Sequence, residues 1–246
     1  MDVFGVELTA AALILVALAA WLGGVAQSSI GFGAAFTTVP ALAVVAPELL
    51  PGSMLVAILP MSLVMVVIDR GGIDLAGVVR LTLGRLPGIV AGAVVVATLA
   101  PRMLTGVIAV VLLAAVAASS GGWQLEVTAN REVAAGFLSG LTGTAAALGG
   151  PPLALLYRGR SGTTLRPTLA AVWAVGLLPA LGSLTIAGEF TMQQAQAGGL
   201  LAVVLLVGLV TGTVLVRTVR DERIRQGVLW WAGLGGLLAL VRAVLG

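Results

Sequence analysis

The sequence predicts an all-α polytopic integral membrane protein with two inverted repeats, each made of a broken or re-entrant helical hairpin plus three transmembrane helices. Composition predicts the membrane class, because 59% of the 246 residues are hydrophobic and 9% are charged, with a mean hydropathy of +1.14. Soluble domains carry about one quarter charged residues. The repeats are predicted by two glycine- and proline-rich interruptions of apolar sequence, which occupy corresponding places in the two halves.

A fixed offset relates the two halves. An offset of 112 residues (136 − 24) superimposes three pairs of helix-breaking residues: Gly24 on Gly136, Gly31 on Gly143, and Pro40 on Pro152. We therefore divide a single transmembrane domain, residues 1–246, into repeat one (1–120), a linker (121–131) and repeat two (132–246).

Repeat one begins with an apolar stretch, residues 8–26, that runs into the first interruption. Asp2 and Glu7 flank this stretch and no basic residue precedes it, so we interpret it as part of the fold and not as a signal peptide. The interruption extends from Gln27 to Gly33 and leads to Pro40. Three spans follow it, at 52–68, 84–100 and 103–119, each close to the ~20 residues that cross a bilayer.

Repeat two begins with a segment of 26 residues, 132 to 157, which is too short for two full spans. Its interruption runs from Thr142 to Thr144 and on to Gly149–Pro152, where two adjacent prolines make one straight helix improbable. A re-entrant hairpin that enters and leaves on one side fits these lengths. Three spans follow, at about 165–187, 192–216 and 226–245.

The arginine distribution supports inverted repeats. If each repeat crosses the membrane an odd number of times, the 13 arginines divide 11 to 2, whereas eight simple spans divide them 8 to 5. Arg102 and Arg242 form the smaller group. The larger group is Arg70, Arg80, Arg85, Arg131, Arg158, Arg160, Arg166, Arg217, Arg220, Arg223 and Arg225. Because positive charges favour the cytoplasm, we expect both termini and the loop around Glu48 to face outward.

The two interruptions are the candidate binding site. Broken helices free backbone N–H and C=O groups, which survive in a membrane only where they are packed or line a wet cavity. A half-helix that begins after Gly33 or at Pro151 would aim its N–H groups at such a cavity and favour an anion. The candidate ligands are Gln27, Ser28, Ser29, Gly31, Gly33, Thr37, Thr38, Thr142, Gly143, Thr144, Gly149, Gly150 and Pro151.

Small residues also have a purely structural interpretation, since they allow helices to approach closely. We prefer this interpretation for three glycine pairs at four-residue spacing: Gly88 and Gly92, Gly136 and Gly140, and Gly208 and Gly212. For the two interruptions we prefer a binding site, because they recur at one offset and carry polar residues.

A tryptophan and one of two arginines complete the candidate site. Arg80 and Arg85 precede Leu86, Pro87 and Gly88 at the start of a predicted span, so either could reach inward as a counter-charge to an anion, although we prefer an interfacial location for both. Trp173 follows Pro167 within a predicted span, and it either lines the cavity or packs at the interface.

Missing residue types exclude several functions. The chain has no cysteine, histidine or lysine, which excludes disulfides, thiolate metal sites, cysteine nucleophiles, histidine proton shuttles and a Walker A loop. We therefore expect no enzymatic activity, no cofactor and no metal. Basic residues lie in short loops between spans, so we expect no nucleic-acid partner. Membrane lipid is the expected surrounding, and a homodimer remains open.

The interruptions resemble the paired signatures of the TauE/SafE sulfite exporter family. The resemblance rests on Gln27–Gly33 with Val39–Pro40 and Leu42, and on Gly136–Gly143 with Gly149–Pro152. It implies secondary transport, usually export, of a small sulfur-containing anion such as sulfite, sulfoacetate or a related organosulfonate across a bacterial inner membrane. Two alternatives remain, a non-catalytic membrane partner subunit and a lipid-handling membrane protein.

Overall fold

The computed structural model describes residues 2–3, 6–121, 125–215 and 221–245, and it is all-helical apart from one pair of two-residue strands. Two of the predicted cytoplasmic arginines, Arg217 and Arg220, lie outside these residues. The α-helices are α1 (Ala10–Ile30), α2 (Ala34–Val45), α3 (Gly52–Ile68), α4 (Leu75–Thr98), α5 (Pro101–Ser120), α6 (Ala129–Ala146), α7 (Gly150–Leu156), α8 (Gly162–Ile186), α9 (Met192–Leu215) and α10 (Asp221–Leu245). The minor elements are strands β1 (Asp2–Val3) and β2 (Val6–Glu7) and the 3₁₀ turns η1 (Pro47–Leu49) and η2 (Arg70–Gly72).

Six of the described helices are long and apolar enough to cross a membrane. They are α1, α4, α5, α8, α9 and α10. Helices α2 and α3 are apolar but shorter, with 12 and 17 residues. Large apolar side chains such as Val90 in α4 and Val210 in α9 point outward, as expected for a surface in contact with lipid. The predicted fold class, an all-α polytopic membrane protein, is confirmed.

Helix α4 begins earlier than the predicted span at residue 84. Asp74 caps it, because its carboxylate Oδ1 accepts a hydrogen bond of 2.9 Å from the N–H of Gly77. Consequently Arg80 belongs to the helix, and Arg85 lies well inside it instead of at its start. This start places Arg85 more than two turns inside α4, which decides its environment.

The two interruptions are narrower than the sequence suggested. Helix α1 runs to Ile30 and ends on Gly31, whose φ of 78° is favourable for glycine. Helix α6 runs to Ala146 and ends on Ala147, with φ 57°. The predicted non-helical residues 27–30 and 142–144 are therefore helical, because polar side chains are tolerated where they bond to nearby backbone. The helix ends are 116 residues apart (147 − 31), so the offset of 112 does not extend through the breaks.

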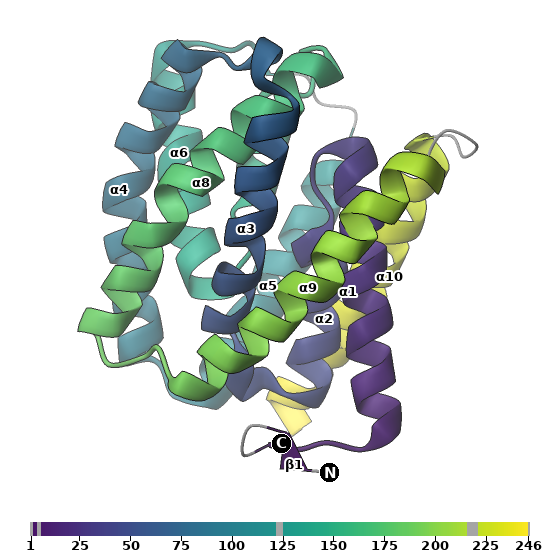
Figure 1. Ribbon diagram of the computed structural model, residues 1–246. Helices are drawn as coiled ribbons and strands as arrows, with labels where there is room; N and C mark the ends of the chain where they lie inside the picture. The colour runs from purple at the N-terminus through teal and green to yellow at the C-terminus, as the bar shows by residue number, and fades with distance from the viewer. Residues whose placement is uncertain (1, 4–5, 122–124, 216–220, 246) are drawn as a thin grey trace.

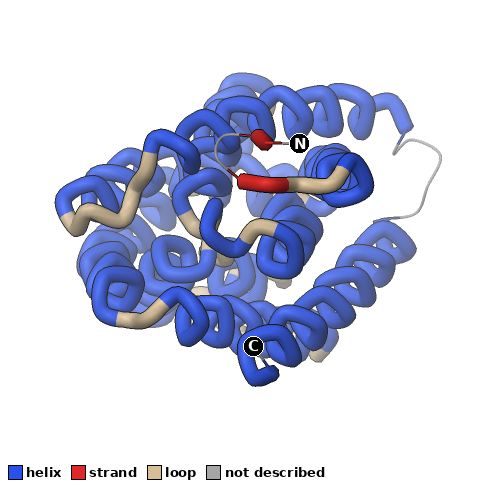
Figure 2. The backbone as a smooth tube through the Cα atoms, turned by 90° about the horizontal axis from the view of Figure 1, so that it is seen from below, coloured by secondary structure: helices blue, strands red, loops and turns tan. Residues whose placement is uncertain are grey.

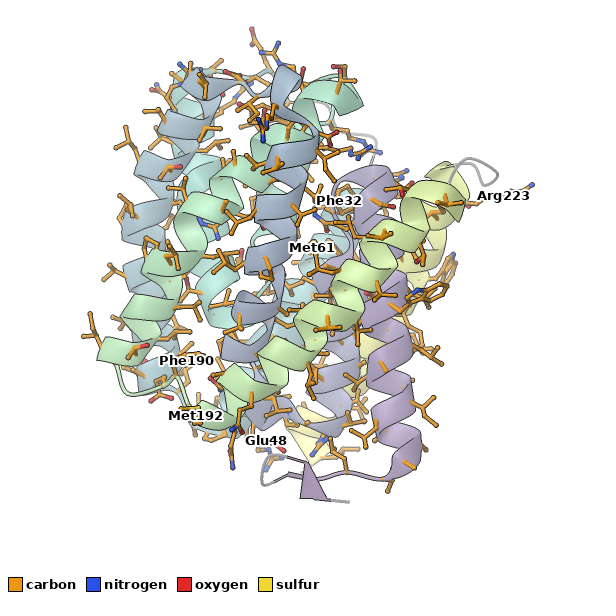
Figure 3. The ribbon with its side chains drawn as sticks, in the orientation of Figure 1. Phe32, Glu48, Met61, Phe190, Met192 and Arg223 are labelled. Atoms are coloured by element: carbon orange, nitrogen blue, oxygen red, sulfur yellow. The ribbon has the colours of Figure 1, made fainter. Side chains whose placement is uncertain are left out.

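The two broken helices, α1 with α2 and α6 with α7, start from and return to opposite ends of the molecule (Figure 1). One end carries both termini, Glu48 and the loop at Phe190 and Met192, and we name it the termini end (Figures 1 and 3). Helix α1 starts there and α2 returns there (Figure 1). The other end, the arginine-rich end, carries Arg223 (Figure 3). Helix α6 starts from it and α7 returns to it, and both termini face the viewer in Figure 2.

The helix contacts repeat between the halves. Helix α1 packs on α9 as α6 packs on α4, and α3 contacts α9 as α8 contacts α4. Helix α2 contacts α10 as α7 contacts α5. A Cβ at Gly24 would lie 2.8 Å from the Cα of Gly208, and one at Gly136 would lie 3.0 Å from the Cα of Leu81. The packing role predicted for the glycine pairs is confirmed by these close approaches.

A buried carboxylate joins the outer parts of α4, α6 and α7. Glu132 in α6 is 1% exposed, forms an ion pair with Arg80 in α4, and accepts a 2.5 Å hydrogen bond from the hydroxyl of Tyr157. Burial, followed by this hydrogen bond, raises the pKa of Tyr157, so the phenol keeps its proton. Asp74 lies 3.4 Å from the same hydroxyl. The cluster fastens the second broken helix to α4.

We expect Glu132→Gln to lower the melting temperature of the purified protein by several degrees. The neutral amide cannot compensate Arg80, and it leaves the buried hydrogen bond from Tyr157 weaker. Glu126→Gln is the matched control, because Glu126 is exposed and lies 4.0 Å from Arg131. Thermal unfolding in detergent measures both variants, and equal melting temperatures would contradict a stabilising role for the cluster.

Candidate functional site

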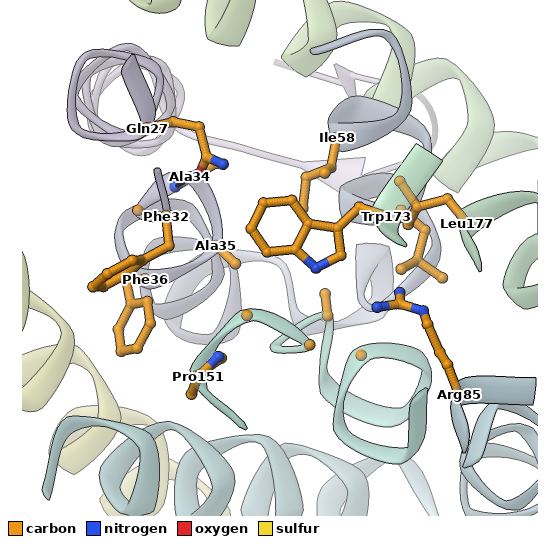
Figure 4. Close-up of a pocket in the computed structure, with 16 residues that line it drawn as sticks. Gln27, Phe32, Ala34, Ala35, Phe36, Ile58, Arg85, Pro151, Trp173 and Leu177 are labelled. Carbon is orange, nitrogen blue, oxygen red and sulfur yellow. Dashed lines mark hydrogen bonds between the residues drawn. The ribbon is translucent and has the colours of Figure 1, made fainter. Parts of the chain in front are cut away.

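A cavity lies where the two broken helices meet. The volume that the centres of water molecules can occupy in it is about 40 Å³, which is room for roughly three waters. Figure 4 shows Arg85 and Trp173 facing it from one side and Phe32 and Phe36 from the other. Its lining residues are Gln27, Phe32, Gly33, Ala34, Ala35, Phe36, Leu55, Ile58, Arg85, Gly143, Ala147, Gly149, Gly150, Pro151, Trp173 and Leu177.

Of the described residues in this lining, Arg85 is the one that carries a charge. It is 2% exposed, and within the described part of the chain no carboxylate lies within 4.0 Å of it. One terminal nitrogen donates a 2.8 Å hydrogen bond to the Oγ of Ser139, and Nε has no acceptor. A buried cation without a counter-charge is costly. The cavity is therefore electrostatically suited to an anion.

Gly176 makes room for the guanidinium. A Cβ at this position of α8 would lie 2.7 Å from the Cδ of Arg85. The arginine side chain therefore extends between α4, α6 and α8 and reaches the cavity instead of the membrane interface. The preference for an interfacial Arg85 was wrong, and it failed because α4 starts at Leu75. Arg80, which is 38% exposed and paired with Glu132, fits the predicted interfacial location.

Ser139 links Arg85 to the second break. Its hydroxyl accepts the hydrogen bond from Arg85 and donates one of 2.6 Å to the carbonyl oxygen of Gly149. This chain of two hydrogen bonds fixes the guanidinium relative to Gly149, which also lines the cavity. Sequence reasoning missed Ser139 as a site residue. Its position between Gly136 and Gly140, on the helix face that packs against α4, was the available signal.

Gln27 stabilises the first break. Its amide nitrogen donates to the carbonyl oxygen of Gly31 at 2.9 Å, and its amide oxygen accepts from the N–H of Ala34 at 3.3 Å. These bonds satisfy backbone groups that the break frees. The N–H groups of Ala35 and Phe36, in the first turn of α2, have no acceptor within the helix. Both residues line the cavity, so their donors and the positive end of the α2 dipole favour an anion there.

The second break supplies fewer donors than predicted. Helix α7 starts where expected, with Pro151 in its first turn. It has only seven residues, and Pro151 and Pro152 carry no N–H. The second half-helix therefore cannot match the first as a source of backbone donors. Arg85 and Ser139 provide the polar groups on this side of the cavity.

The structure brings eight of the predicted site residues together at the cavity. They are Gln27, Gly33, Arg85, Gly143, Gly149, Gly150, Pro151 and Trp173. Trp173 thus takes the cavity location, one of its two alternatives. Sequence reasoning missed the aromatic side chains Phe32 and Phe36, because a break flanked by glycines drew attention to backbone groups.

The predicted hydroxyls do not line the cavity. Several donate to backbone carbonyl oxygens one turn earlier: Ser28 to Val25, Thr37 to Gly33 and Ala34, and Thr142 to Leu138. The Thr142 hydroxyl also lies 3.0 Å from the carbonyl oxygen of Leu148 in the second break. The hydroxyls of Thr38 and Thr144 are buried without a partner. Ser29 and Gly31 also lie outside the lining, and the Cβ position of Gly31 faces Arg166 and Leu165. These residues serve the helices and their contacts, because helical geometry turns short polar side chains back to their own backbone.

Comparison with protein families gives one match. The family model of the sulfite exporter TauE/SafE matches residues 16–239, which include both helix breaks and the whole cavity lining. Searches of curated proteins and of solved structures found no match.

Proposed function

Because the chain belongs to the sulfite exporter TauE/SafE family, whose members are membrane transporters and not enzymes, we propose that it exports a small sulfur-containing anion by alternating access. The observation that carries the proposal is Arg85, a buried cation that faces the central cavity without a carboxylate partner among the described residues. We place the protein in a bacterial inner membrane.

The proposed binding mode uses three kinds of group. Arg85 supplies the positive charge, the N–H groups of Ala35 and Phe36 donate to the oxyanion, and Trp173 covers it with apolar surface. Few fixed charges contact the ligand, so it can be released as well as bound.

The proposed transport cycle rests on inverted repeats. The equivalent contacts of α1 with α9 and of α6 with α4 support a relation between residues 1–120 and 132–246 across the linker 121–131. Broken helices that open to opposite ends and meet at one site are typical of transporters in which one repeat rocks against the other. Such a motion exposes the same cavity first to one side of the membrane and then to the other. Cofactors and metals have no part in this proposal.

Purified protein in liposomes tests the function. We expect it to move sulfite down a concentration gradient. Sulfoacetate, sulfate and phosphate should each compete with sulfite to a different extent, whereas cations and neutral amino acids should not compete. Calorimetry on the same protein measures binding. If the protein binds a cation or a lipid and binds none of the oxyanions, the proposal is rejected. Binding of sulfite without transport would instead indicate a partner subunit.

Topology provides an independent prediction. We expect cysteines at Gly71 and Gly159 to react from the cytoplasm and cysteines at Glu48 and Glu189 to react from outside. Gly71 and Gly159 have no atom within 4 Å of a Cβ position, so the substitutions are tolerated. Because the natural chain has no cysteine, a membrane-impermeant thiol reagent labels only the introduced cysteine. Labelling of intact cells and of inverted vesicles then shows on which side of the membrane each position lies. Labelling of positions 71 and 159 from opposite sides would rule out the inverted arrangement.

A further inference from the structure

A second cavity adjoins the central one. It has a volume of about 260 Å³ and is lined by Phe32, Ser119, Ala154, Leu155, Arg158, Leu165 and Arg225. Phe32 is the one residue that this lining shares with the lining of the central cavity. The side chain of Phe32 therefore stands in the wall between the two spaces.

Hydrogen bonds hold two arginines in the wall of the second cavity. Arg158 donates to the carbonyl oxygen of Gly121, and Arg225 donates to that of Ser119 at 3.0 Å. Both acceptors lie at the C-terminal end of α5, where the helix dipole favours cations. We name this space, defined by Phe32, Arg158 and Arg225, the inner vestibule. Its fixed positive charge would concentrate anions beside the central cavity.

The termini end has an equivalent cavity. It has a volume of about 510 Å³, and its lining includes Arg102 and Arg242 together with Glu48 and Glu189. Arg102 begins α5 and donates to the carbonyl oxygens of Ala243 and Val244 at the end of α10. Arg225, near the start of α10, bonds in the same way to the end of α5. Each end thus has a mouth with two arginines at an equivalent place in the fold, and the mouth at the termini end also has two glutamates.

The two mouths differ in their separation from the central cavity. The lining of the mouth at the termini end shares no residue with that of the central cavity, whereas the inner vestibule is separated by the Phe32 side chain. Phe32 lies between Gly31 and Gly33, whose φ angles of 78° and 151° are accessible to glycine. A half-buried ring on such a segment can swing without disturbing a regular helix. The ring rests 5.8 Å, centroid to centroid, from that of Phe36.

We propose that Phe32 is the gate between the central cavity and the inner vestibule, through which the anion passes at the arginine-rich end. The identity of the anion rests on the proposed function, but the gating role rests on the two cavities and their shared residue. When the ring swings away, the anion can pass from Arg85 to the vestibule lined by Arg158 and Arg225.

Thiol accessibility tests the gate without measuring transport. Leu177→Cys places a thiol in the central cavity, and Leu155→Cys places one in the inner vestibule. A small sulfonate-bearing methanethiosulfonate is applied in inside-out vesicles, which expose the cytoplasmic side. We expect Phe32→Ala to speed modification of the thiol at position 177 about tenfold or more and to leave modification of the thiol at position 155 unchanged. Phe32→Trp should slow modification at position 177.

Ile58→Ala is the matched control, because Ile58 lines the central cavity and not the inner vestibule. It should leave the rate at position 177 close to that of the parent. Equal acceleration by the Phe32 and Ile58 variants, or no acceleration by Phe32→Ala while the thiol at position 155 reacts, would overturn the gate. Wild-type protein that binds no oxyanion, combined with the expected rates, would reject the proposed function and keep the gate.

Discussion

Replacing Arg85 by Gln should abolish anion transport and weaken sulfite binding by about 30-fold or more, since losing one partner of a buried, hydrogen-bonded charge pair costs roughly 2 kcal/mol or more. The amide retains polarity but has no charge with which to balance the anion. Among the residues that the structure describes, no other cation lines the central cavity, so no described neighbour can substitute. Transport into liposomes and calorimetry measure the two effects.

Thermal stability separates this role of Arg85 from a structural one. Without ligand, the buried cation is a cost to the folded state, so Arg85→Gln should unfold at the same or a higher temperature than wild type. Sulfite should raise the melting temperature of wild type and not that of the variant. If the variant instead loses stability and keeps its sulfite-dependent shift, Arg85 is a structural residue.

Two further variants complete the Arg85 series. Arg85→Lys should retain part of the binding, because it keeps the charge but loses the planar geometry that reaches both Ser139 and the cavity. Arg131→Gln should behave as wild type, because Arg131 is a half-exposed arginine near Glu126 in the linker region. A similar loss of transport in this control would point to a general effect of net charge.

The fold could be predicted further than the site. Apolar span lengths and the glycine pairs depend on local sequence, and the structure places α3 at residues 52–68 as predicted. The site depends on contacts between distant residues. Arg85 and Ser139 are 54 positions apart, and only the packing of α6 on α4 brings them together.

Helix boundaries explain the remaining errors. The cap at Asp74 moved Arg85 from the start of a span to a position well inside a helix, and its side chain from the interface into the cavity. The hydroxyls of Thr37 and Thr142 carry the right chemistry for an oxyanion, but α2 and α6 continue through them, and they bond to their own helices. A residue's chemistry can be read from sequence, whereas its direction depends on where the helix starts and ends.

Gly149→Val should also abolish transport, while leaving a protein that is folded in detergent. A Cβ at Gly149 would lie 2.8 Å from the carbonyl oxygen of Ser139 and 3.2 Å from both its Oγ and the Cα of Gly143. A β-branched side chain there forces the second break away from α6. The displacement breaks the hydrogen bond from Ser139 to Gly149 and releases the support of Arg85. Overpacking of this kind costs about 1–3 kcal/mol. If the whole cost destabilises the anion-bound state, the affinity for the anion falls by up to roughly 100-fold.

Gly182→Val is the matched control for this substitution, because Gly182 in α8 has no atom within 4 Å of a Cβ position. It should transport as wild type. Gly149→Ala should be intermediate, since it adds the clashing Cβ without the branches. Efflux from liposomes and thermal unfolding distinguish a displaced site from a misfolded protein. The contacts of α1 with α9, and those of α4 with α6 around Gly84 and Gly136, lie apart from the second break and keep the fold. Wild-type transport by Gly149→Val would mean that the break is a packing feature and that the anion binds elsewhere.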